Sequence, residues 1–117
     1  MDLRAAYEED KALKEKFVAA IESKWQLDAP IISKADRCVL GNWLHGEADR
    51  KYKFLKSYKP CMEAHDEFHT QAAKLARQIN LGEFDAARAM LENGTPFSKS
   101  LAALGLALIQ LKKDAKL

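Results

Sequence analysis

The sequence of 117 residues contains only two cysteines, three histidines, five glycines and three prolines. Glycine and proline, which break helices, are few, and no segment alternates apolar and polar residues as a strand does. Both observations favour an all-helical chain. No apolar run approaches the ~18 residues of a transmembrane helix, and the first residues lack the layout of a signal peptide. We therefore expect no membrane insertion and a cytoplasmic location. In that compartment, two cysteines are expected to be free thiols or metal ligands rather than a structural disulfide.

Neither sign of charge dominates the chain. Nineteen basic residues against seventeen acidic ones give a formal net charge of +2, and the two signs are interspersed except in the C-terminal tail. This balance gives no argument for nucleic-acid binding. The chain is 48% hydrophobic and 31% charged, and its length suits one core, so we expect residues 1–117 to form a single domain.

Apolar residues recur at helical spacing in three long segments, which predict helices over about 3–25, 59–80 and 96–113. Shorter helices are predicted over about 36–44 and 83–91. Short connections between such helices favour antiparallel neighbours. The predicted fold class is therefore all-α: an antiparallel four-helix-bundle-like domain, with a short additional helix that bears a cysteine motif.

Local signals mark the ends of these predicted helices. Asp36 is expected to cap the cysteine-bearing helix and Gly46 to stop it, with a polar, Lys- and Tyr-rich connection following. Pro60 suits the first turn of the second long helix. Thr95 is expected to cap the last helix and Pro96 to occupy its first position.

Four polar residues interrupt apolar helix faces. Asp10 lies seven residues after Leu3 and seven before Phe17, so it is expected to face the core, where an unpartnered carboxylate is costly. His65 and His69 lie one turn apart on the apolar stripe of the second long helix, a spacing at which two imidazoles can converge on one cation. Cys38 shares its short helix with apolar residues and is also expected to point inward.

Together, Asp10, Cys38, His65 and His69 predict one tetrahedral metal site, for which zinc is the natural occupant. Each residue also has a structural interpretation. A lone buried cysteine is usually a small hydrophobe, and Asp10 could be a solvated residue or the partner of a lysine. In a metal-free helical dimerisation or interaction module, Asp10 would instead pair with protonated His65 or His69.

The remaining candidates favour structural roles. His45, just before Gly46, is expected to be exposed. Cys61 could be an alternative ligand or a resolving thiol, but its place beside Pro60 favours a partly exposed, inert cysteine. Trp25 and Trp43 are expected to be core or interface aromatics.

Beyond these residues, the segment "CVLGNWLHGEA" resembles the motif Cys-x-Leu-Gly-x-Trp-Leu-x-Gly-Glu-Gly of the chemoreceptor zinc-binding (CZB) family. His65 and His69 match that family's His-x-x-x-His, and the resemblance extends over nearly the whole chain. Two positions depart from the pattern. Asp10 stands where the family has its first histidine ligand, and Ala48 replaces the motif's last glycine. An aspartate remains an allowed zinc ligand.

The resemblance implies a bacterial regulatory or sensory domain rather than an enzyme, either free-standing or part of a longer protein. It implies sensing of zinc, or of oxidants such as hypochlorous acid through zinc-bound Cys38, and signalling by conformational change. A homodimer is expected, with a chemoreceptor of chemotaxis or a diguanylate cyclase as signalling partner. A zinc hydrolase is the less favoured alternative because no residue stands out as a general base. A hemerythrin-type di-iron carrier is excluded because three histidines are too few.

Overall fold

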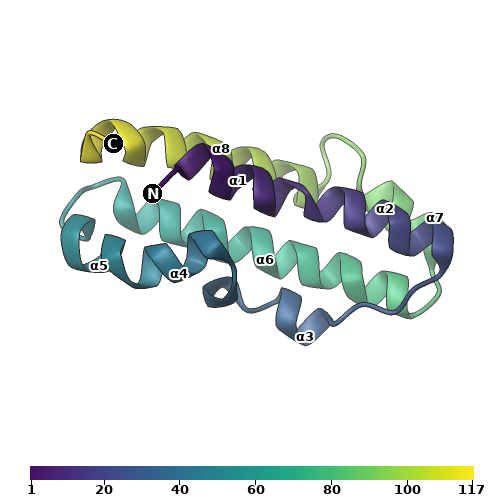
Figure 1. Ribbon diagram of the computed structural model, residues 1–117. Helices are drawn as coiled ribbons and strands as arrows, with labels where there is room; N and C mark the ends of the chain where they lie inside the picture. Colours follow the sequence, from purple (N-terminus) through teal and green to yellow (C-terminus); the bar gives the residue numbers. More distant parts are fainter.

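The computed structural model describes residues 1–117, which fold into helices and turns with no strand (Figure 1). The predicted all-α class is therefore confirmed. No helix is both long enough and apolar enough to cross a membrane. In chain order the elements are α1 (Leu3–Lys11), α2 (Leu13–Ser23), α3 (Ala29–Ile32), the 3₁₀ turn η1 (Ala35–Arg37), α4 (Val39–His45), α5 (Glu47–Tyr52), α6 (Tyr58–Asn80), α7 (Phe84–Met90) and α8 (Pro96–Ala115).

The elements form four antiparallel rods (Figure 1). The chain runs out along α1 and α2, returns through α3, α4 and α5, runs out again along α6, and returns along α8. The α6 helix contacts α8, α2 and α3, while α1 contacts α4 and α8. This is the expected bundle-like arrangement, in which the second rod is broken into short helices and α6 is central.

A continuous cluster of buried apolar side chains extends from Leu3 to Leu111. Within it, the ring centroid of Phe97 lies 5.8 Å from that of Phe17 and 5.6 Å from that of Phe68. These contacts join α8 to α2 and α6 and place three large apolar groups out of water, which favours the compact state.

The first long helix differs from its prediction in two places, since it is interrupted at Ala12 and ends at Ser23 rather than near Trp25. α1 ends at Lys11 and α2 begins at Leu13, because the turn at Ala12 interrupts the regular hydrogen-bond pattern. No glycine or proline marks this interruption. α2 then ends where Lys24 adopts a left-handed conformation, with φ of 56°.

The second rod contains the main corrections to the predicted elements. Asp36 is not a helix cap, because it lies inside η1. The N-cap of α4 is Cys38, whose Sγ accepts a hydrogen bond from the backbone N–H of Gly41 at 3.2 Å. Gly46 ends α4 as expected. Neither α3 nor α5 was predicted; α5 occupies most of the first half of the expected polar connection.

The second half of the chain follows its local signals closely. α6 begins at Tyr58, so Pro60 lies in its first turn as predicted. Thr95 is the N-cap of α8, its side chain accepts a hydrogen bond from the N–H of Ser98, and Pro96 is the first helical residue. The predictions of these helices and caps are confirmed.

Candidate metal centre

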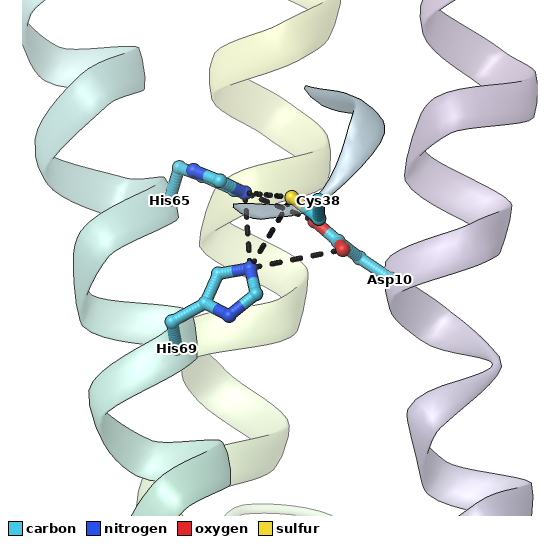
Figure 2. Close-up of side chains that lie close together, drawn as sticks. All are labelled: Asp10, Cys38, His65 and His69. Carbon is cyan, nitrogen blue, oxygen red and sulfur yellow. Dashed lines mark hydrogen bonds and ion pairs between the residues drawn. The ribbon is translucent and has the colours of Figure 1, made fainter. Parts of the chain in front are cut away.

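Four side chains from different parts of the chain converge inside the bundle (Figure 2). They are Asp10 in the last turn of α1, Cys38 at the start of α4, and His65 and His69 on α6. One potential ligand atom from each residue can be chosen so that all four lie within 4.8 Å of one another. The residues expected to form a metal site are thus brought together.

Each element orients its side chain by simple means. His65 and His69 are four residues apart, so they occupy one buried face of α6, and both are almost fully buried. Asp10 is 3% exposed on the α1 face that packs inward. Cys38 is half-buried, and its Sγ lies 3.6 Å from the carbonyl oxygen of Ala35 as well as accepting from Gly41.

The distances among the four groups are nearly uniform. His65 Nε2 lies 3.2 Å from Cys38 Sγ, 3.2 Å from His69 Nε2 and 3.1 Å from Asp10 Oδ2. His69 Nε2 lies 3.5 Å from Cys38 Sγ and 3.7 Å from Asp10 Oδ1. Cys38 Sγ lies 3.9 Å from Asp10 Oδ2, so His65 and Cys38 approach one carboxylate oxygen of Asp10 and His69 approaches the other.

The three distances among the nitrogen and sulfur atoms can be compared with those of a tetrahedral zinc site. Zinc bonds of about 2.0–2.1 Å to nitrogen and about 2.3 Å to sulfur imply nitrogen–nitrogen edges of ~3.3 Å and nitrogen–sulfur edges of ~3.6 Å in tetrahedral geometry. The contact between the two Nε2 atoms and the contacts from Cys38 Sγ to each Nε2 lie near these values. The donor set therefore fits zinc in both chemistry and size.

The imidazole ring of His69 is held by a further hydrogen bond. Its Nδ1 lies 2.8 Å from the carbonyl oxygen of Ile32, and because a carbonyl can only accept, Nδ1 carries the proton. In the neutral ring, Nε2 then presents its lone pair to the cluster, as a metal ligand must. By contrast, His65 Nδ1 is buried without a hydrogen-bond partner.

Hydrogen bonds among the four groups account poorly for so many short distances. Each Nε2 can hold one proton, so a few hydrogen bonds would have to serve six short contacts. If both rings were protonated, two N–H groups would face each other across the 3.2 Å between the Nε2 atoms. A single cation among the four groups would satisfy all of them at once.

Without a metal, the four groups shift one another's pKa values strongly. Burial would by itself raise the pKa of Asp10, but hydrogen bonds from His65 and His69 outweigh it and lower the pKa to about 2. The same balance lowers the pKa of the Cys38 thiol to about 7. Burial would lower the pKa of both imidazoles, yet hydrogen bonding with Asp10 and Cys38 raises that of His65, and raises that of His69 to about 10. The cluster thus favours ionised acidic groups.

The other candidate residues lie outside this group. His45 is exposed, as expected. Cys61 was expected to be partly exposed and is instead fully buried, which raises the pKa of its thiol to about 12. Trp43 is a core residue at 7% exposed, whereas Trp25 is 59% exposed.

Sequence reasoning missed two positioning groups. The carbonyl of Ile32 belongs to α3, which carries no strong sequence signal, and backbone oxygens cannot be identified from residue type. Gly41 could have been found from its place in the cysteine motif. A Cβ at this position would overlap the carbonyl oxygen of Ala35, so only glycine lets α4 pack against η1 as closely as it does.

A helical bundle whose interior brings together one Asp, one Cys and two His residues has the architecture expected of a helical metal-binding domain. The sequence model of one such family, the chemoreceptor zinc-binding domain, matches residues 11–76, more than half of the chain, and the chain belongs to this family. The match contains Cys38, His65 and His69 and begins one residue after Asp10. The family is a regulatory, zinc-binding one rather than a catalytic one. Searches of curated proteins and of solved structures found no match.

Proposed function

We propose that this chain is a regulatory domain in which Asp10, Cys38, His65 and His69 bind one zinc ion. The observation that carries the proposal is the set of short contacts, 3.1–3.9 Å, through which the ligand groups of these four buried or half-buried residues converge. Bound zinc would keep Cys38 as a thiolate and would balance the charges of Cys38 and Asp10, since both imidazoles would be neutral.

The signal that we propose is a change in zinc or in oxidant, read through Cys38. When hypochlorous acid oxidises the thiolate, sulfur gains the oxygen and loses two electrons, and chloride leaves. The resulting sulfenic acid is a poorer ligand than the thiolate. Because Cys38 is also the N-cap of α4, loss of its ligand bond frees this helix end to shift against α1 and α6.

Elemental analysis of the purified protein tests the zinc site, and about one zinc per chain is expected. The Cys38→Ser variant then tests the switch. Serine is a good N-cap and keeps the hydrogen bond to Gly41, but it supplies no thiolate. We expect the variant to remain folded, to bind zinc weakly, and to lose its conformational response to hypochlorous acid. A variant that kept this response would rule out Cys38 as the sensor.

A metal-free interaction module is the second candidate, because the short Asp10 contacts would also suit charged histidines. His65 Nε2 lies 3.1 Å and His69 Nε2 3.7 Å from the carboxylate. A protein purified without chelators that held no zinc, and acquired none on titration, would favour this function.

The assembly that we propose is one domain over residues 1–117 acting as a homodimer. The core cluster extends from Leu3 to Leu111 and so includes α8, beyond the segment matched by the family. Exposed Leu106 and Ile109 lie three residues apart on one face of α8 and supply apolar surface for a second copy. A chemoreceptor or a diguanylate cyclase is the proposed signalling partner.

A further inference from the structure

A surface depression of about 240 Å³ opens directly over the four-residue cluster. Cys38, Asp10 and His69 lie along its lining, together with the apolar side chains of Leu13, Ile31 and Ile32. Since Cys38 is half-buried while Asp10 and His69 are almost fully buried, this depression is where a small solute can meet the sulfur.

The charged residues around this mouth are mostly basic. Lys16, Lys34 and Arg37 line it and are exposed, and the exposed acidic residue among them is Glu9. None of the three cations forms an ion pair, because the ion pairs of the structure join Lys51 to Glu47, Arg88 to Asp85, and the two histidines to Asp10. Among the exposed groups, three cations against Glu9 leave an excess of two positive charges, while the buried carboxylate of Asp10 also lines the depression.

Such an arrangement attracts anions for two reasons. The apolar side chains in the lining lower the local dielectric and focus the field of the charges. The charges also lie around one small opening, and at 0.1 M salt fields persist over about 10 Å. With zinc in the site, Asp10 and thiolate Cys38 would be balanced by the ion, so they would not cancel the positive mouth.

We propose that Lys16, Lys34 and Arg37 form an anion-selective mouth that favours small anionic oxidants and electrophiles over neutral or cationic ones at Cys38. The inference rests on the proposed function in taking Cys38 as the reactive group and zinc as the ion that balances Asp10 and the Cys38 thiolate. It assigns a role to three residues from α2, η1 and the segment between α3 and η1 that contact no proposed ligand atom through a hydrogen bond.

Three methanethiosulfonates of similar size and different charge test the mouth. They carry a sulfonate, a neutral hydroxyl and a trimethylammonium group. In each case the Cys38 thiolate attacks the sulfenyl sulfur, a mixed disulfide forms, and methanesulfinate leaves with the electron pair of the broken S–S bond. The ratio of the anionic to the neutral rate is the readout, because any change in thiolate population affects both rates equally.

The measurements use the zinc-loaded full chain with Cys61→Ala, so that Cys38 is the one thiol present. We expect the triple variant Lys16→Gln, Lys34→Gln, Arg37→Gln to lower the anionic-to-neutral ratio by about tenfold at low salt. High salt should lower the ratio of the parent protein in the same direction. In Glu9→Gln the ratio should rise instead, which provides a second test in a variant with a single change.

The matched control is Lys99→Gln, Lys112→Gln, Lys113→Gln, which removes three positive charges from α8, away from the mouth. It should leave the ratio almost unchanged. Equal ratios in the parent and the mouth variant, or an equal decrease in the control, would overturn the inference. If instead the neutral reagent failed to modify Cys38, the failure would lie with Cys38 as the sensor and hence with the proposed function.

Discussion

At position 10 an aspartate stands where the family resemblance places a histidine, and its carboxylate lies 3.1 Å from His65 Nε2. Exchanging an imidazole for a carboxylate changes the proposed zinc site from a net charge of +1 to zero. With less positive charge at the site, the Cys38 thiolate is attracted to the metal less strongly and should be a better nucleophile. A harder oxygen donor should also bind zinc less tightly than an imidazole nitrogen does.

We therefore predict that Asp10→His binds zinc more tightly and has a less reactive Cys38 than the parent protein. Competition with a chromophoric chelator measures the affinity, and the rate of alkylation by iodoacetamide measures the reactivity. The matched variant Asp10→Ala should weaken zinc binding, since it supplies no ligand atom. Equal affinity and equal alkylation rates in the Asp10→His and parent proteins would refute the prediction.

Cys61 offers a contrast between two thiols of one chain. It is fully buried, and burial raises its pKa to about 12, whereas the pKa of Cys38 without metal is about 7. At pH 8 a thiol with pKa 12 is ionised to only ~10⁻⁴, because its pKa lies four units above the pH.

We predict that alkylation of the native, zinc-depleted protein at pH 8 modifies Cys38 and leaves Cys61 unmodified. Peptide mass spectrometry identifies the modified residue, and a sample unfolded in denaturant serves as the control in which both react. Modification of Cys61 at a rate similar to that of Cys38 in the folded protein would contradict this expectation and would restore Cys61 as a possible resolving thiol.

At the scale of elements, the junction of η1 and α4 positions the sulfur. Gly41 donates its N–H to Cys38 Sγ, and a Cβ on Gly41 would overlap the carbonyl oxygen of Ala35. Helix propensity alone would make an alanine more favourable than this glycine by about 1 kcal/mol. The steric overlap of a Cβ with the backbone of Ala35 destabilises the folded state instead, and this effect should exceed the gain in helix propensity.

Gly41→Ala is therefore predicted to destabilise the protein by about 2 kcal/mol and to weaken zinc binding, because η1 and α4 must separate. Urea unfolding and chelator competition provide the two measurements. Gly82→Ala is the control: its φ of 78° also disfavours alanine, but nothing lies near the added methyl group, so stability should fall while zinc affinity stays the same. An unchanged affinity in Gly41→Ala would argue against a positioning role.

How far the sequence predicts the structure differs between the two halves of the chain. α6 and α8 are long, strongly periodic and marked by Pro60 and Thr95, so their type and limits could be predicted. The second rod consists of short helices whose limits depend on tertiary contacts. Asp36 has good capping chemistry, yet the sulfur of Cys38 caps α4 because η1 occupies the preceding residues.

Three of the four site residues were predictable for a related reason. Asp10, His65 and His69 interrupt apolar stripes of long helices, where periodicity fixes the direction of a side chain. Their mutual distances and the bond from His69 Nδ1 to the carbonyl of Ile32 depend on how α1, α3 and α6 pack. Patterns along one chain do not contain that information.

At the scale of the whole molecule, the proposed zinc site connects three of the bundle's four rods. Its ligands lie on α1, at the start of α4 and on α6. Since the unfolded chain cannot hold these groups together, zinc should bind the folded state preferentially. At free zinc a thousand times the dissociation constant, such binding stabilises a protein by about 4 kcal/mol.

We predict that removing zinc with a chelator lowers the free energy of unfolding by about this amount, and that adding zinc restores it. The loss should be largely absent in Cys38→Ser, which binds zinc weakly from the start. His45→Ala, which changes an exposed histidine outside the cluster, should behave as the parent protein. Equal stability of the zinc-bound and zinc-depleted parent protein would contradict this prediction.

The proposed homodimer gives α8 a second role besides packing on α6. Leu106 is 70% and Ile109 54% exposed, and both lie on the face directed away from buried Leu104 and Leu108.

We predict that the double variant Leu106→Glu, Ile109→Glu shifts the protein from dimer to monomer in sedimentation equilibrium, because charges placed in an apolar contact are costly to desolvate. Leu81→Glu, at a residue 75% exposed beyond the end of α6, is the control and should remain dimeric. A parent protein that is monomeric at high concentration, or a double variant that stays dimeric, would show that α8 is not the dimer interface.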